Sequence, residues 1–167
     1  MAVAKITDTG SDIVLSCDLK SAASVSAAGG TYSGVTFTDN GFVPGTSGIT
    51  FTISNSQLQY SGQIVCTVNA QDVCDADDGS SVSGSRGINR MASGYVFAWR
   101  NGSGTNTGRL FVGADNRLEA RTSASDTAIS TKIVTHGKND VELCVAWKGD
   151  KYAILVNGAV LVPGTRS

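Results

Sequence analysis

The densest group of residues that could do chemistry lies in the polar segment 71–93. Four aspartates come first there and two arginines follow, namely Asp72, Asp75, Asp77, Asp78, Arg86 and Arg90. Clustered carboxylates supply the oxygen ligands that calcium prefers, so Asp75, Asp77 and Asp78 are candidate calcium ligands. An EF-hand loop does not fit, because Ser80 stands where the turn glycine belongs and no glutamate closes the set. Two other interpretations stay open: a solvated acidic loop, or contact of these charged residues with a partner protein.

Paired carboxylates for glycoside hydrolysis are the next chemistry to consider. Such enzymes hold two carboxylates about 5–10 Å apart across the scissile bond. The only two glutamates, Glu119 and Glu142, fall on separate predicted strands, and we expect both to be exposed. A Ser/His/Asp site would have to use His136, the only histidine, which lies in a polar turn. We therefore expect no catalytic residues, no cofactor and no enzymatic activity.

The four cysteines are predicted to be free thiols. The N-terminal residues show neither the apolar core nor the cleavage motif of a secretory signal, so we expect synthesis in a host cytoplasm, where thiols stay reduced. Cys17, Cys66 and Cys144 lie in strand-like runs and are expected to be buried, whereas Cys74 lies in a polar loop and is expected to react. No C-x-x-C spacing accompanies the single histidine, which argues against a zinc site.

Length and charge narrow the class of protein. The 167 residues are typical of one domain, which we assign to residues 1–167. The formal net charge of −1 argues against a nucleic-acid partner, and no apolar run is long enough to predict a membrane span. Residues 1–11 could form an extended arm. Residues 71–93 form a long loop, of the kind that usually marks function or partner contact.

The segment 141–158 is the element around which the other strands are organised. It reads as two β-strands joined by a tight turn at Gly149-Asp150, followed by a second turn at Asn157-Gly158 into residues 159–162. This register pairs three large apolar residues with three others across the hairpin: Trp147 with Tyr152, Val145 with Ile154, and Leu143 with Val156. The aligned apolar side chains predict a three-strand meander with one face in the core.

The second face of this meander is also apolar. It carries Cys144, Ala146, Ala153 and Leu155. A sheet that is apolar on both sides is normally covered on both sides, so we expect another part of the fold or a partner protein to cover it. Leu155 is therefore a candidate partner contact.

Short alternating runs elsewhere predict about eleven strands in two packed sheets. The clearest runs are 12–17, 35–38, 49–54, 63–68, 95–100, 109–113 and 129–135. We interpret residues 21–30 as a linker or irregular edge and residues 42–45 as a turn with one buried aromatic residue.

Three packing expectations follow from the alternation. Facing Trp99 with Leu110 and Phe97 with Val112 would give one continuous apolar face. A loop over residues 114–116, with Asn116 left-handed, would pair Leu118 with Val112. The Trp147/Tyr152 face should then pack on the Phe97/Trp99 face.

The order of these elements resembles the concanavalin A-like lectin/glucanase and laminin G-like superfamily. Four stretches carry the resemblance, which covers roughly residues 32–162: Gly94-Tyr-Val-Phe-Ala-Trp, Gly108-Arg-Leu-Phe-Val-Gly, Val141-Glu-Leu-Cys-Val-Ala-Trp and Tyr152-Ala-Ile-Leu-Val-Asn-Gly. The resemblance implies an all-β fold, a two-sheet antiparallel jelly-roll sandwich. It also implies that loop calcium sites and sugar binding are worth testing. The E-x-D-x-E-like sets of the glucanase branch match no strand here.

We expect a bacteriophage virion protein, specifically a capsid decoration or cement subunit that stabilises the shell through protein–protein contacts. The small β domain, the low charge and the long polar segment support this hypothesis. Its partners would be the major capsid protein or other virion subunits, including copies of itself, with no nucleic acid and no membrane. The alternative is a carbohydrate- or receptor-binding module of a tail fibre or spike, although no heptads or repeats precede the domain. An enzyme is the third hypothesis.

Overall fold

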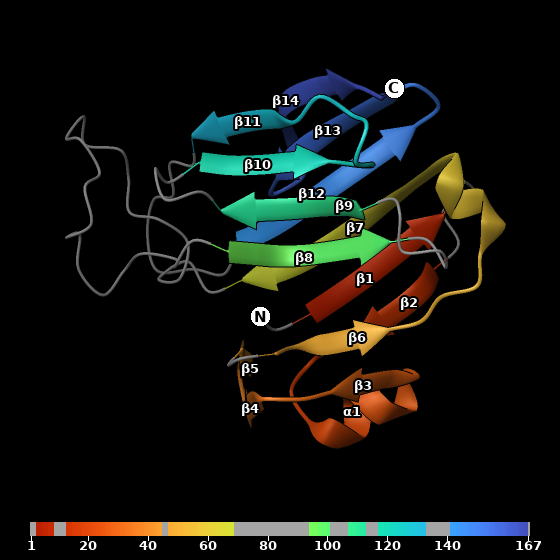
Figure 1. Cartoon of the computed structure of the whole chain (residues 1–167). Coiled ribbons are helices and arrows are strands. Elements are labelled where there is room, and N and C mark those ends of the chain that lie inside the picture. Colours follow the sequence, from red (N-terminus) through yellow and green to blue (C-terminus); the bar gives the residue numbers. More distant parts are fainter. Residues whose placement is uncertain are drawn as a thin grey trace, which may run out of the picture.

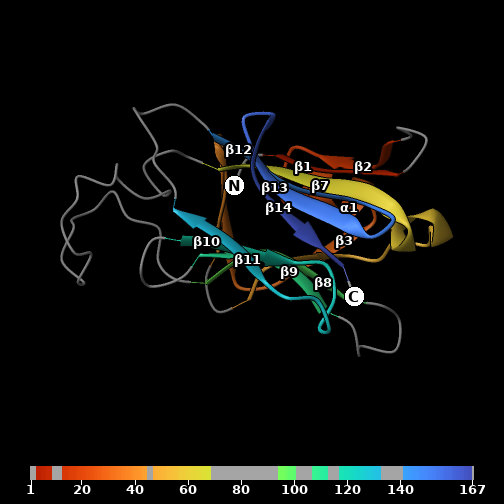
Figure 2. The ribbon, with the colours of Figure 1, turned by 90° about the horizontal axis from the view of Figure 1, so that it is seen from above.

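The protein folds into antiparallel β-sheets with one short α-helix (Figure 1). The computed structural model describes residues 3–8, 13–44, 47–68, 94–100, 107–112, 117–132 and 141–166. Two main sheets face each other, as Figure 2 shows edge-on. The predicted all-β class is confirmed.

The larger sheet has six strands in the order β14-β13-β12-β7-β1-β2. Its strands are β1 (Val3–Asp8), β2 (Ile13–Cys17), β7 (Ser61–Val68), β12 (Val141–Lys148), β13 (Lys151–Val156) and β14 (Ala159–Thr165). Part of the segment expected as an extended arm is therefore β1, which pairs with β2 on one side and with β7 on the other.

The meander over residues 141–165 forms in the predicted register. β12 and β13 pair Trp147 with Tyr152, and the same ladder continues to Leu143 and Val156. The first turn has positive φ at Gly149 (57°) but not at Asp150, which is the pattern of a type II′ turn. The second turn has positive φ at both Asn157 (49°) and Gly158 (80°), as a type I′ turn requires.

The smaller sheet is a meander of four consecutive strands in the order β11-β10-β9-β8. They are β8 (Gly94–Arg100), β9 (Thr107–Val112), β10 (Arg117–Arg121) and β11 (Ile129–Lys132). The predicted pairing of Leu118 with Val112 is confirmed, whereas Asn116 lies outside the described residues.

The predicted register of β8 against β9 is wrong by two residues. Phe97 faces Leu110 and Trp99 faces Gly108. The pairing also shifts by one residue at an irregularity between Tyr95 and Phe97. An extra residue of this kind in one strand is a β-bulge, which alternation of apolar residues does not reveal.

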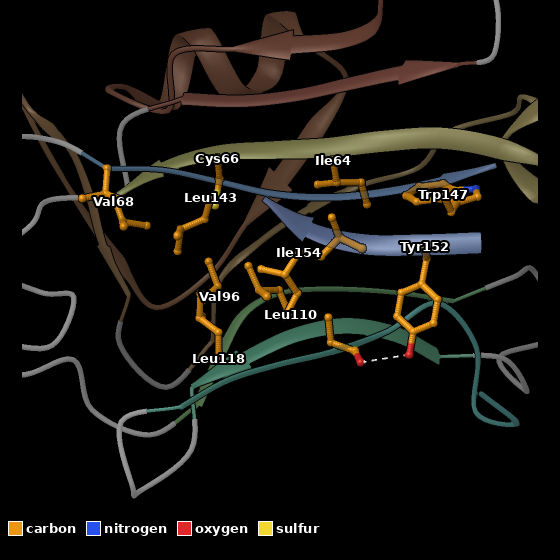
Figure 3. Packing of buried hydrophobic residues seen from close by; sticks show 13 residues of the cluster. Ile64, Cys66, Val68, Val96, Leu110, Leu118, Leu143, Trp147, Tyr152 and Ile154 are labelled. Carbon is orange, nitrogen blue, oxygen red and sulfur yellow. Dashed lines mark hydrogen bonds between the residues drawn. The ribbon is translucent and has the colours of Figure 1, made fainter. Parts of the chain in front are cut away.

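The main core fills the space between the two sheets. Figure 3 shows Leu143 and Ile154 of the large sheet directed toward Leu110 and Leu118 of the small sheet, and all four are fully buried. The predicted aromatic packing across this space is confirmed, since Trp99 and Trp147 stack with ring centroids 5.4 Å apart and planes 16° apart.

A second, smaller core lies beyond the β2 edge of the large sheet. It is built by α1 (Ala22–Ala27), β3 (Gly30–Tyr32), β4 (Val35–Thr38), β5 (Gly41–Pro44) and β6 (Ile49–Phe51), with the 3₁₀ turn η1 (Ser56–Gln59) after it. Its buried residues are Cys17, Leu19, Val25 and Phe42.

Two expectations for this region are wrong. Residues 21–30, expected as a linker or irregular edge, include α1, which begins with a capping box between Ser21 and Ser24 and buries Val25. Residues 42–45, expected as a turn, belong largely to β5, although the predicted aromatic residue, Phe42, is buried.

Candidate interaction surfaces

Most of the predicted site residues lie outside the described residues. This holds for Asp72, Asp75, Asp77, Asp78, Arg86 and Arg90, so the calcium and partner-contact hypotheses for segment 71–93 stay predictions. His136 and Cys74 also lie outside that part of the chain. Within the described ranges, no group of three or more His, Cys, Asp and Glu residues could hold a metal ion.

The two glutamates face opposite sides of the molecule. Glu119 lies on β10 beside the buried Leu118 and Ala120, so it points away from the core, and it forms an ion pair with Arg109. Glu142 lies on β12 of the six-stranded sheet, beside the buried Val141 and Leu143. It points to solvent from the outer side of that sheet. With both sheets between them, these two carboxylates cannot flank one glycosidic bond.

Asp126 is a buried carboxylate that the sequence analysis did not single out. One of its oxygens accepts hydrogen bonds from the backbone N–H groups of Thr122 and Ser123, both at 3.0 Å, and from the Thr122 hydroxyl. The other oxygen accepts from the Ser123 hydroxyl at 3.1 Å. These bonds order the turn between β10 and β11, which is a structural role.

The first candidate surface is the solvent-facing side of strands β7, β12, β13 and β14, which we call the apolar face. Strand alternation directs Cys144 and Ala146 to this side, since the adjacent Leu143 and Val145 are fully buried in the core. Cross-strand pairing adds neighbours on the same side. The apolar face consists of Val65, Cys144, Ala146, Ala153, Leu155 and Val160.

The apolar face is only partly shielded within one chain. Cys144 is buried and its thiol donates to Gln63 Oε1 at 4.0 Å, whereas Leu155 is half-buried and Val160 is 60% exposed. No described helix or strand lies over this side of the sheet (Figure 2). Leu155, the predicted contact residue, therefore lies on a surface that the described part of the chain leaves partly exposed.

Charges of opposite sign stand at the two ends of the apolar face. Exposed Glu142 lies at one end of β12, and exposed Lys148 lies at the other end next to its cross-strand partner Lys151. Lys148 follows Glu142 by six positions along the strand, which corresponds to about 20 Å. Lys151 has an ion-pair partner in Asp150 at 3.2 Å, but Lys148 has none among the described residues.

The second candidate surface is the solvent-facing side of strands β8 to β11, which we call the arginine face. Leu110, Leu118 and Ala120 point into the core, so the residues that alternate with them point outward. These outward residues include Arg109, Phe111, Glu119 and Arg121, and the pairing of β8 adds Ala98 and Arg100.

The arginines of this face differ in their partners. Arg109 pairs with Glu119, and its guanidinium lies 5.5 Å from the centre of the Phe111 ring. Arg100 and Arg121 have no ion-pair partner among the residues that the structure describes, and the buried Nε of Arg121 has no hydrogen-bond partner there. This surface cannot be seen from the net charge, because the net charge averages all faces of the protein.

The described cysteines are buried free thiols, as predicted. Cys17, Cys66 and Cys144 are 4%, 1% and 4% exposed. Burial raises the pKa of Cys66 to about 12 and that of Cys144 to about 12, and the carboxylate of Glu142 adds to the effect at Cys144.

Native-state alkylation tests this assignment. At pH 8 the thiolate fraction of a group with a pKa near 12 is about one in ten thousand. We expect iodoacetamide to leave Cys66 and Cys144 unmodified in the folded protein and to modify both after unfolding in urea, as read by peptide mass spectrometry. Rapid modification of either residue in the folded protein would contradict the burial.

The same pKa shifts predict a loss of stability at alkaline pH. Above the ordinary thiol pKa of 9.0, the unfolded chain releases these protons while the folded chain keeps them. The free energy of unfolding should therefore fall as pH rises from 9 toward 12, by about 1 kcal/mol per thiol at pH 10. Chemical denaturation at pH 8 and pH 10 checks this, and the Cys144→Ala variant should show a smaller difference between the two pH values.

Comparison with protein-family models, curated proteins and solved structures finds no match to this chain. None of the helices in the described ranges is long and apolar enough to cross a membrane. The two surfaces defined above are consequently the basis for assigning a function.

Proposed function

We propose that this protein is a non-enzymatic structural subunit of a bacteriophage virion, a capsid decoration or cement protein that acts through protein–protein contacts. The observation that carries this proposal is the apolar face, which includes the half-buried Leu155 and the exposed Val160 on a side of the sheet that no described helix or strand covers. An exposed apolar area on a soluble protein usually marks an interaction site.

We also propose a specific fold class for this protein. We place the two facing antiparallel sheets in the concanavalin A-like jelly-roll class. Support comes from the six-stranded and four-stranded sheets with one core between them and from the confirmed hairpin 141–156. Contacts of the segment 71–93 with a major capsid protein are the remaining part of the proposed role.

The partner at the apolar face is a second copy of the chain. Consider two copies whose apolar faces are stacked and related by a 180° rotation. If the axis lies between the two sheets and runs perpendicular to β12 at its middle, Glu142 of each copy lies over Lys148 of the other. The same rotation places the small Ala153 over the large Leu155, since these residues pair with Ala146 and Cys144 on β12. Both the charges and the side-chain sizes of this face are therefore complementary to themselves in an antiparallel stack of sheets.

Charge reversal tests this arrangement. The Glu142→Lys variant would place lysine over lysine at both ends of the interface, and we expect it to be largely monomeric at concentrations where the wild type is dimeric. The double variant Glu142→Lys/Lys148→Glu restores opposite charges and should regain the dimer. Both residues are exposed, so neither change should disturb the fold. Size-exclusion chromatography with light scattering measures the outcome.

A second pair of variants tests the apolar contact. Val160→Asp should weaken the dimer, whereas Val43→Asp, at a residue of similar exposure on β5, should not. A wild-type protein that stays monomeric at high concentration would contradict the self-association, as would equal effects of the two aspartate variants. Binding of the protein to purified phage shells, and a gene located beside a major capsid gene, would test the virion role.

A further inference from the structure

Basic residues occupy a diagonal line of backbone positions across the four strands of the arginine face, β8 to β11. Register places Lys132 on β11 opposite Arg117 on β10, and Arg121 on β10 opposite Arg109 on β9. Arg109 pairs with Ala98 on β8, and Arg100 lies two residues further along that strand. The line runs diagonally over about 25 Å, given about 4.8 Å between strands and about 3.3 Å per residue.

Acidic residues do not balance this line. In strands β8 to β11, the one acidic residue is Glu119, and it is already paired with Arg109. Arg100 is exposed and Arg121 is half-buried, and both lack an ion-pair partner among the described residues. Among the described side chains of this face, three arginines stand against the single Glu119, so the face is positive although the whole chain has a formal net charge of −1.

The length of the line favours an extended anionic ligand. A single small anion would contact one or two of these residues, whereas a linear polyanion can contact them in succession. Arginine suits carboxylate and sulfate groups, because its planar guanidinium donates two parallel hydrogen bonds.

The described aromatic residue on this face argues against a single-stranded nucleic acid. Such ligands bind by stacking their bases on exposed aromatic rings as well as through phosphates. Phe111 is half-buried, and the Arg109 guanidinium lies 5.5 Å from its ring centre, so this ring is not open for stacking. We propose that the arginine face binds a linear acidic polysaccharide that carries carboxylate or sulfate groups.

This binding surface is independent of the proposed self-association. The arginine face and the apolar face lie on opposite outer sides of the two sheets (Figure 2), so a dimer formed through the apolar face leaves the arginine face open. Failure of either proposal therefore leaves the other intact, and the two are measured separately.

Binding of fluorescent alginate, dextran sulfate and neutral dextran to the full chain tests the proposal. We expect alginate or dextran sulfate to bind at low salt, with the better of the two identifying the preferred anion, and neutral dextran not to bind. Binding should weaken steeply as salt screens the charges. The Arg100→Gln/Arg121→Gln variant should bind about tenfold more weakly or worse.

A matched variant separates this site from overall charge. Lys20→Gln/Lys151→Gln removes two exposed positive charges outside the arginine face and should change the affinity by less than about twofold. Arg100→Lys/Arg121→Lys keeps the charge but loses the paired hydrogen bonds, so its affinity should be intermediate. Circular dichroism and melting curves establish that each variant is folded.

Three results would overturn the inference. The first is that neither acidic polysaccharide binds at low salt. The second is that the two glutamine double variants weaken binding equally. The third is that single-stranded DNA of similar length binds more tightly than either polysaccharide. The last result would assign the face to a nucleic acid instead.

Discussion

Replacing Trp147 with alanine should lower the free energy of unfolding by about 3–5 kcal/mol. Trp147 is 6% exposed and stacks on Trp99, so the substitution removes a large buried ring and leaves a cavity between the sheets. It also removes the indole N–H that donates to the Leu58 carbonyl at 2.7 Å. A domain of this size has a total stability of about 5–15 kcal/mol, so a substantial part of it would be lost.

Two control variants separate the causes of that loss. Trp147→Phe keeps most of the ring packing but loses the donor to Leu58, and we expect a smaller loss, with about 1 kcal/mol of it from the hydrogen bond. Tyr60→Ala removes an aromatic ring that is 60% exposed and should change stability by less than about 0.5 kcal/mol. Urea unfolding followed by circular dichroism gives all three values. A Trp147→Ala loss no larger than that of Tyr60→Ala would contradict the cross-sheet core.

The second large effect is expected at Gly108. This residue faces Trp99 across β8 and β9, and a Cβ atom built at Gly108 would overlap the Trp99 ring. Gly108→Ala should therefore force Trp99 out of its stack on Trp147 or separate the two strands, which costs about 1–3 kcal/mol or more. Gly108→Val should be worse.

Gly48 provides the matched control, because a Cβ atom there would meet nothing within 4 Å. Gly48→Ala should leave the melting temperature nearly unchanged while Gly108→Ala lowers it by several degrees. In a Trp99→Leu background the effect of Gly108→Ala should shrink, because the clashing ring is gone. If Gly108→Ala were as harmless as Gly48→Ala in the wild-type background, the close approach of Trp99 to β9 would be wrong.

Much of the fold could be predicted from sequence because of period-two alternation and turn chemistry. The meander 141–165 is the best case, because Gly149-Asp150 and Asn157-Gly158 fix the register of three strands at once. That register puts Leu143, Val145 and Ile154 on one side of the sheet, and all three are fully buried.

Other elements carry too weak a local signal. Helix α1 is a six-residue run of small residues whose only buried side chain is Val25, so no apolar periodicity marks it. The irregularity between Tyr95 and Phe97 shifts the pairing of β8 with β9 by one residue, and the apolar pattern of β8 gives no sign of it.

Sequence by itself determined that segment 141–158 has two apolar faces, because alternating side chains of a strand point to opposite sides. Only the tertiary structure decided what happens to each face. One packs on Trp99, Leu110 and Leu118 across the core. No described helix or strand covers the other, which has opposite charges at its ends. The arginine face could not be predicted from the sequence, since Arg100, Arg109 and Arg121 become neighbours only when β8, β9 and β10 pair.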